Sequence, residues 1–373
     1  MSETKKEHQF VSLTGMRGIA CIFIVFYLYY CVYFGNLGIG PQALPFFPQS
    51  HIIFEYSKNA VELCFMISGF LTAYHYRDKI ATLAPLDYVK KRYGKLISPS
   101  IIVNLWALIN VLLILGNVPG SAEWVSPVTP LRTVLSILMI NTGWFTSYPQ
   151  TDLPINSTMW FIDVLLLCYL LYYLIRKLAK NQFAYRCACV AMVLVGWICL
   201  EHSPQLPFLW PIDGRGYAPF FIGALLCEFQ TSAREEVKER VSLVWGALIL
   251  GFFVVRLFIG FENVFGPIGG FAYVRYFEFI AAPGLLLVAL NLRPITGLLS
   301  WKGFVWLGAL SGAIYYVTNC LLEDYFLLNA VTGSTINFSS GLVFIAVVVS
   351  VIPFALLWQL AENKLKAARS TAA

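Results

Sequence analysis

Apolar segments long enough to cross a lipid bilayer recur along this chain from one end to the other. A membrane-spanning helix needs about 20 mostly apolar residues. Only 12% of the residues are charged and the mean hydropathy is +0.71, whereas soluble domains carry about 25% charged residues. We therefore expect an all-α fold, a polytopic membrane helical bundle. Ten segments reach or approach the required length: 16–34, 60–76, 97–115, 159–178, 186–200, 216–229, 241–261, 273–290, 304–322 and 341–360.

These segments leave no room for a separate soluble catalytic domain, although 373 residues would suggest two or three soluble domains by length alone. We predict a tail over residues 1–12, one membrane domain over residues 13–362 and a second tail over residues 363–373. The first apolar segment has no small-residue cleavage site, so we expect a retained span rather than a signal peptide.

The distribution of Lys and Arg predicts that both ends of the chain are cytoplasmic, because cytoplasmic loops collect these residues. In that orientation the outer side contains few cations, and the exceptions are Lys58, Arg132, Arg215 and Arg275. The apolar run 131–145 would place the cluster at Arg176 outside if it crossed the membrane. We therefore exclude it as a span, and a re-entrant or interfacial segment is the alternative. The expected inner cations are Arg77, Lys79, Lys90, Lys91, Arg92, Lys95, Arg176, Lys177, Lys180, Arg186, Arg234, Lys238, Arg240, Arg293, Lys302, Lys364, Lys366 and Arg369.

Two other classes of protein do not fit this composition. The nine cysteines are scattered through apolar segments without the paired spacing of a zinc site, so we expect no bound metal. The net charge of +6 is concentrated in short loops. It therefore indicates membrane topology rather than nucleic-acid binding.

Charged residues inside membrane spans are costly to bury, and this makes them candidates for function. Arg17 and Glu228 lie near the expected inner surface, where the alternative is a side chain that reaches the lipid headgroups. Glu62 and Asp163 lie deeper in their segments and indicate a polar cavity or a polar contact between helices. The basic stretch 90–95 (KKRYGK) could bind a phosphate-rich ligand, or it could mark topology and contact anionic lipids.

Several motifs, in order and with matching spacing, resemble those of the acyltransferase 3 family of integral membrane acyltransferases. Residues 13–20 (LTGMRGIA) resemble the start of the family domain, and residues 61–71 (VELCFMISGFL) resemble its second-span signature. Residues 91–95 (KRYGK) are similar to its double-basic motif, although Pro99 falls one place late. Further similarities are Trp160-Phe161, residues 308–311 (GALS) with Tyr315, and Trp358 with Glu362.

The resemblance implies a catalytic pair in the first span, an arginine followed eleven positions later by a histidine. Those two positions share a helix face and are about 16 Å apart. The arginine is Arg17, but the histidine position is Leu28, which cannot move a proton. Tyr27, Tyr29 and Tyr30 beside it are poor bases at neutral pH. A second family histidine, after the region of Tyr315, is replaced by Thr318 and Asn319, and none of the four histidines (His8, His51, His75 and His202) lies inside the first span.

With no histidine at these positions, Glu62 and Asp163 are the candidate acceptors of a hydroxyl proton. Arg17 is the third candidate catalytic residue. His51 and His202 in outer loops are alternatives. Lys91, Arg92 and Lys95 would hold the phosphates of the donor, acetyl-CoA or another acyl-CoA.

The resemblance implies O-acylation of an envelope or cell-surface carbohydrate. The acceptor would be a lipid-linked or secreted glycan. The expected location is a bacterial cytoplasmic membrane, where the partners are acyl-CoA, the glycan and membrane lipids. Two alternatives remain open because Leu28 occupies the histidine position: a transporter or carrier subunit for the acyl group or glycan, and an inactive relative that acts as a scaffold. The oligomeric state is not predicted.

Overall fold

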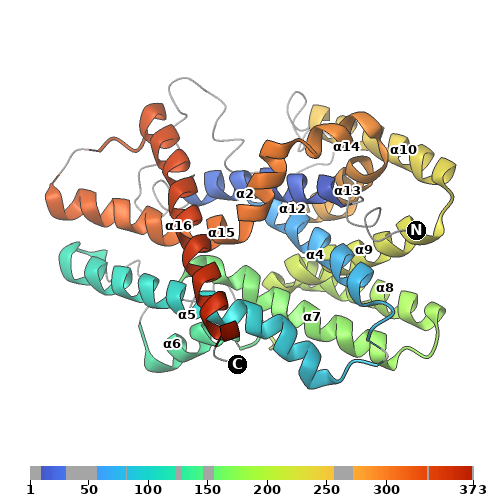
Figure 1. Cartoon of the computed structure of the whole chain (residues 1–373), viewed down its shortest axis with the longest axis horizontal. Helices are drawn as coiled ribbons and strands as arrows, with labels where there is room; N and C mark the ends of the chain where they lie inside the picture. The colour runs from blue at the N-terminus through green and yellow to red at the C-terminus, as the bar shows by residue number, and fades with distance from the viewer. Residues whose placement is uncertain are drawn as a thin grey trace.

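The structure is a computed structural model that describes residues 10–30, 57–80, 82–121, 128–145, 155–255, 272–333 and 336–371 (Figure 1). Within these ranges every regular element is a helix. The elements are α2 (Val11–Tyr30), α4 (Ala60–Tyr76), α5 (Pro85–Asn117), α6 (Pro130–Ile137), the 3-10 turn η3 (Ser157–Met159), α7 (Trp160–Leu178), α8 (Gln182–His202), α9 (Pro211–Ser232), α10 (Glu235–Val254), α12 (Ala272–Tyr276), the π-helical turn η5 (Phe277–Ala281), α13 (Ala282–Asn291), α14 (Arg293–Leu299), α15 (Lys302–Thr332) and α16 (Gly341–Thr371).

Each of the ten predicted segments overlaps one of these helices or, for segment 273–290, the continuous run from α12 through η5 to α13. Among the described residues, seven helical segments are long and apolar enough to cross a membrane: 11–30, 85–117, 157–178, 182–202, 274–291, 302–332 and 341–364. The prediction of a multi-pass helical membrane protein is confirmed. The cytoplasmic placement of both ends and the division into tails and membrane domain stay predictions, and α16 continues as a helix through most of the predicted tail.

The apolar run 131–145 contains only a short helix. Helix α6 has eight residues, so it extends about 12 Å and cannot cross a bilayer. Its N-terminus is capped by Thr129, whose side chain accepts a hydrogen bond from the backbone N–H of Arg132 at 3.2 Å. Excluding this run as a span was therefore correct.

Two arginines expected in outer loops lie inside helices instead. Arg132 belongs to α6 and is 7% exposed, and Arg215 belongs to α9 and is 8% exposed. Helix α9 starts earlier than expected, at Pro211, because proline suits the first helical turn. The carboxylate of Asp213 also accepts the backbone N–H of Trp210 at 3.0 Å. The sequence-based placement of Arg215 in a loop was wrong.

Glycines allow two pairs of helices to approach closely, as small residues do in membrane bundles. A Cβ atom added at Gly69 of α4 would lie 1.9 Å from the carbonyl oxygen of Phe220 in α9. A Cβ atom added at Gly308 of α15 would lie 1.9 Å from the carbonyl oxygen of Thr14 in α2. The second contact, between α2 and α15, determines where the side chain of Arg17 lies.

Candidate active site

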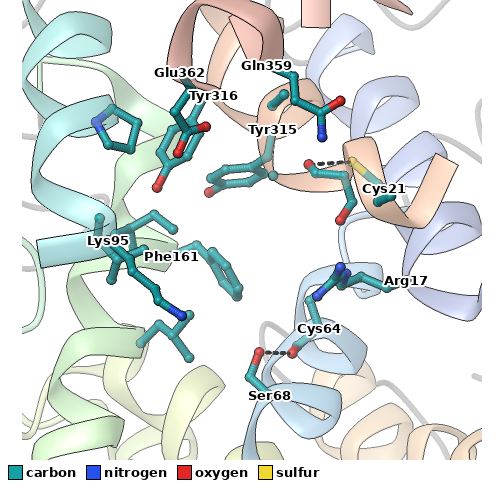
Figure 2. Close-up of a pocket in the computed structure, with 18 of the residues that line it drawn as sticks. Arg17, Cys21, Cys64, Ser68, Lys95, Phe161, Tyr315, Tyr316, Gln359 and Glu362 are labelled. Atoms are coloured by element: carbon teal, nitrogen blue, oxygen red, sulfur yellow. Dashed lines mark hydrogen bonds between the residues drawn. The ribbon is translucent and has the colours of Figure 1, made fainter. Parts of the chain in front are cut away.

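A cavity of about 740 Å³ lies between six helices, α2, α4, α5, α7, α15 and α16 (Figure 2). Its volume falls within the range of about 300–1,000 Å³ that is typical of small-molecule sites. Most of the lining surface is apolar, although more than half of the lining residues have polar or charged side chains. The polar and charged lining residues are Arg17, Cys21, Cys64, Ser68, Lys95, Tyr169, Ser311, Tyr315, Tyr316, Gln359, Glu362 and Asn363.

Arg17 projects into this cavity from α2 (Figure 2). Its Nη2 donates a hydrogen bond to the carbonyl oxygen of Gly308 at 2.8 Å. The hydroxyl of Ser311 donates to the same oxygen, also at 2.8 Å. The Nε of Arg17 is buried and has no hydrogen-bond partner in the structure. The guanidinium is therefore anchored at one nitrogen while its side chain lines the cavity.

Lys95 reaches into the cavity from α5, opposite Arg17 (Figure 2). Lys91 lies one helical turn earlier, is exposed and does not line the described part of the cavity. Arg92 is also absent from that lining. Of the three cations predicted to hold the donor, the structure brings Lys95 together with Arg17.

The guanidinium of Arg92 packs instead between aromatic rings. Its central carbon lies 4.5 Å from the ring centroid of Tyr76 and 4.4 Å from that of Tyr169. One guanidinium nitrogen also donates to the hydroxyl of Thr72 at 3.2 Å. These contacts join α5 to α4 and α7, so Arg92 has a structural explanation that does not require a ligand.

Asp163 does not line the described part of the cavity. Its side chain is fully buried in α7. One carboxylate oxygen accepts the backbone N–H of Thr142 at 3.0 Å, and its backbone carbonyl accepts the indole N–H of Trp144 at 3.1 Å. Asp163 therefore ties the segment that follows α6 to the start of α7.

Glu62 is also outside the described lining and is fully buried in α4. Its Oε1 accepts a hydrogen bond from the Nε of Arg215 at 2.5 Å, in a buried ion pair. The guanidinium of Arg215 lies over the ring of Trp160, 4.7 Å from its centroid. Glu62 therefore contacts a neighbouring helix rather than the cavity.

A comparison with known families identifies the chain. The family model for the acyltransferase domain of acyltransferase 3 matches residues 10–359. The chain belongs to the acyltransferase 3 family. The match includes residues on all six helices that line the cavity, and it identifies the chain as a membrane acyltransferase without specifying a substrate. A comparison with curated proteins found no match, and a comparison with solved structures found none either.

In this acyltransferase the described cavity lining contains no histidine. Leu28 packs in the core at 9% exposure and is not part of that lining. His202 is exposed at the end of α8, and His75 is exposed at the end of α4. His51 and His8 lie outside the described residues.

Sequence reasoning did not assign roles to several residues that line the cavity of this acyltransferase. Glu362 on α16 carries the one carboxylate of the described lining. Tyr315 on α15 lines it too, and its hydroxyl donates to the carbonyl oxygen of Thr158. Both residues had been noted for their similarity to family motifs. Those motifs could have pointed to Glu362 and Tyr315 as functional residues. That both residues line one cavity depends on how α15 and α16 pack.

Proposed function

We propose that this membrane acyltransferase transfers an acyl group, most simply acetyl, from acyl-CoA to a hydroxyl of an envelope or cell-surface carbohydrate. The observation that supports the proposal is the pair of cations, Arg17 and Lys95, on opposite walls of one cavity of about 740 Å³. Arginine forms forked hydrogen bonds to phosphate oxygens, and lysine supplies a compact positive charge. The pair therefore suits a ligand that combines phosphates with an apolar arm, as acyl-CoA does.

In the proposed reaction, the acceptor hydroxyl oxygen attacks the thioester carbonyl carbon of the donor. A carbon–oxygen bond forms, and the carbon–sulfur bond breaks to release the CoA thiolate. The hydroxyl proton passes to a base and then to that thiolate, so no net proton is consumed. Arg17 and Lys95 bind and orient the donor.

We assign the base to Glu362, because it is the carboxylate of the described cavity lining. General-base catalysis requires hydrogen-bond reach to the hydroxyl that loses its proton. Glu62 and Asp163 are engaged by Arg215 and by the backbone of Thr142. We therefore propose structural roles for these two acids, in place of the catalytic roles predicted from the sequence.

The test uses purified protein in lipid nanodiscs, acetyl-CoA labelled in its acetyl group, and lipid-linked glycan extracted from the native membrane. We expect label in the glycan together with free CoA. Lys95→Ala should reduce transfer at low donor concentration by about tenfold or more, since a charge-assisted contact contributes about 1.5–3 kcal/mol. Lys91→Ala is the matched control and should retain wild-type transfer. Equal transfer by the two variants would contradict the role of Lys95, and no label in any carbohydrate would contradict the acceptor class.

Leu28 supports a second candidate, a carrier subunit that binds the acyl donor but leaves the chemistry to a partner. A leucine in the family's histidine position supplies no base. The same assay separates the two functions. A carrier would bind acyl-CoA with Arg17 and Lys95, yet the purified chain would release no CoA until a native-membrane extract is added.

A further inference from the structure

Away from the cavity, two acids and an arginine are sealed between helices. Glu62 of α4, Arg215 of α9 and Glu278 of η5 are 0%, 8% and 0% exposed, and none of them lines the described part of the cavity. Glu62 and Arg215 form the 2.5 Å ion pair. Glu278 is not used in the proposed reaction.

Glu278 has no hydrogen-bond partner in the structure for either carboxylate oxygen. The charges that act on it come from Glu62, Arg215 and Arg275. Arg275 forms its own ion pair with Glu201 of α8. Among the described residues, the carboxylates of this group (Glu62, Glu201 and Glu278) thus outnumber its guanidinium groups (Arg215 and Arg275) by one.

The other helices packed on η5 do not supply the missing positive charge. Helix α13 contains no titratable residue. Helix α10 has its charged residues in its first two turns, 235–240, and none of them is among the groups that act on Glu278. An unpaired carboxylate buried without hydrogen bonds costs several kcal/mol, so a charge of this kind is normally neutralised.

The space around these acids restricts what can neutralise them. Both Glu62 and Glu278 are 0% exposed, so neither has room beside it for a water molecule or a hydrated ion. The Oε2 of Glu62 also has no partner, and neither does the side-chain oxygen of the fully buried Asn59, one helical turn earlier. A proton on Glu278 requires no extra room. It removes the charge of the carboxylate, which lowers the cost of burying it.

The backbone at this point is also unusual. Glu278 lies in the π-helical turn Phe277–Ala281, inside the candidate span 274–291. Single π-helical turns within α-helices occur frequently at functional sites.

We propose that Glu278 is a buried proton-binding site: Glu278 carries a proton at neutral pH, while Arg215 balances the charge of Glu62. The site is separate from the donor cavity. Its test does not depend on acyl transfer, so it can fail while the proposed function stands.

The test is infrared spectroscopy of the full-length protein in nanodiscs, with ¹³C-labelled glutamate to separate Glu from Asp bands. At neutral pH we expect a protonated-carboxyl band that is absent in Glu278→Gln and present in Glu239→Gln, a control at an exposed acid of α10. Identical carboxyl bands in wild type and Glu278→Gln would overturn the proposal. If Glu278→Gln does not fold, Glu278→Asp removes the labelled group and should lose the ¹³C-shifted band; retention of that band would overturn the proposal equally.

A second measurement asks whether the site holds a proton or a metal cation. The choline chloride in the buffer is replaced by sodium chloride at constant pH. We expect the Glu278 band to stay unchanged, because the site has no room for a larger cation. Loss of the band in sodium would overturn the assignment to a proton and assign the site to a metal cation.

Discussion

Replacing Arg17 by alanine should weaken donor binding strongly while leaving the fold nearly intact. The arginine donates to the carbonyl oxygen of Gly308, which also accepts the hydroxyl of Ser311. After Arg17→Ala this oxygen keeps its bond from Ser311. The loss in the free energy of unfolding should therefore stay near that of one ordinary hydrogen bond, about 0.5–1.5 kcal/mol.

The expected effect on donor affinity is larger. A hydrogen bond between a guanidinium and a phosphate contributes about 1.5–3 kcal/mol. At about 1.4 kcal/mol for each tenfold change, the Kd for acyl-CoA should rise about ten- to 150-fold. Arg17→Lys keeps the charge but loses the forked geometry, so its Kd should lie between those of wild type and Arg17→Ala.

The assay is equilibrium binding of acyl-CoA to protein in nanodiscs, with thermal unfolding measured on the same samples. Arg293→Ala is the control, since Arg293 is exposed on α14 and does not line the described cavity. A folded Arg17→Ala protein with wild-type Kd would refute the assignment of the cavity to the donor. A second check is Arg17→Ala combined with Ser311→Ala, which leaves the oxygen of Gly308 without either donor. Because this oxygen keeps its backbone hydrogen bond inside α15, the pair should cost about 0.5–1.5 kcal/mol more than Arg17→Ala alone.

Three further predictions concern residues that hold the bundle together. Gly223→Val should abolish recovery of monodisperse protein in size-exclusion chromatography, because a Cβ atom at Gly223 would lie 2.0 Å from the carbonyl oxygen of Met66. Gly251→Ala is the control and should behave as wild type, since a Cβ atom at Gly251 would have no neighbouring atom within 4 Å. Asp163→Ala leaves a buried backbone N–H without its partner and should lower stability by about 1–3 kcal/mol in thermal unfolding; a loss of transfer activity at unchanged stability would instead support its catalytic role. Arg92→Lys should lower stability by about 1 kcal/mol through weaker stacking on two tyrosine rings, and a tenfold weaker affinity for acyl-CoA at unchanged stability would show that it binds the donor.

The positions of the helices could be predicted because the signal is local. A run of apolar residues must satisfy its backbone hydrogen bonds within the segment when no water is present, and a helix does this without a partner. The start of α9 could not be predicted from a local signal of this kind, as its first ten residues show. They include Asp213 and Arg215, and the helix there depends on a capping contact to Trp210 and on an ion pair with Glu62, 153 positions away.

The sequence by itself determined that this protein is a helical membrane protein of the acyltransferase 3 type, because apolar length and ordered motifs are properties of consecutive residues. Tertiary structure alone decided which charged side chains share a cavity. Lys91 and Lys95 have the same chemistry and lie one turn apart, yet Lys95 alone lines the described part of the cavity with Arg17. Glu62 and Asp163, which the sequence predicted to be catalytic acids, form hydrogen bonds with partners on other segments. The physical reason is that the environment of a buried charge is set by whichever helix packs against it, and that helix is distant in the sequence.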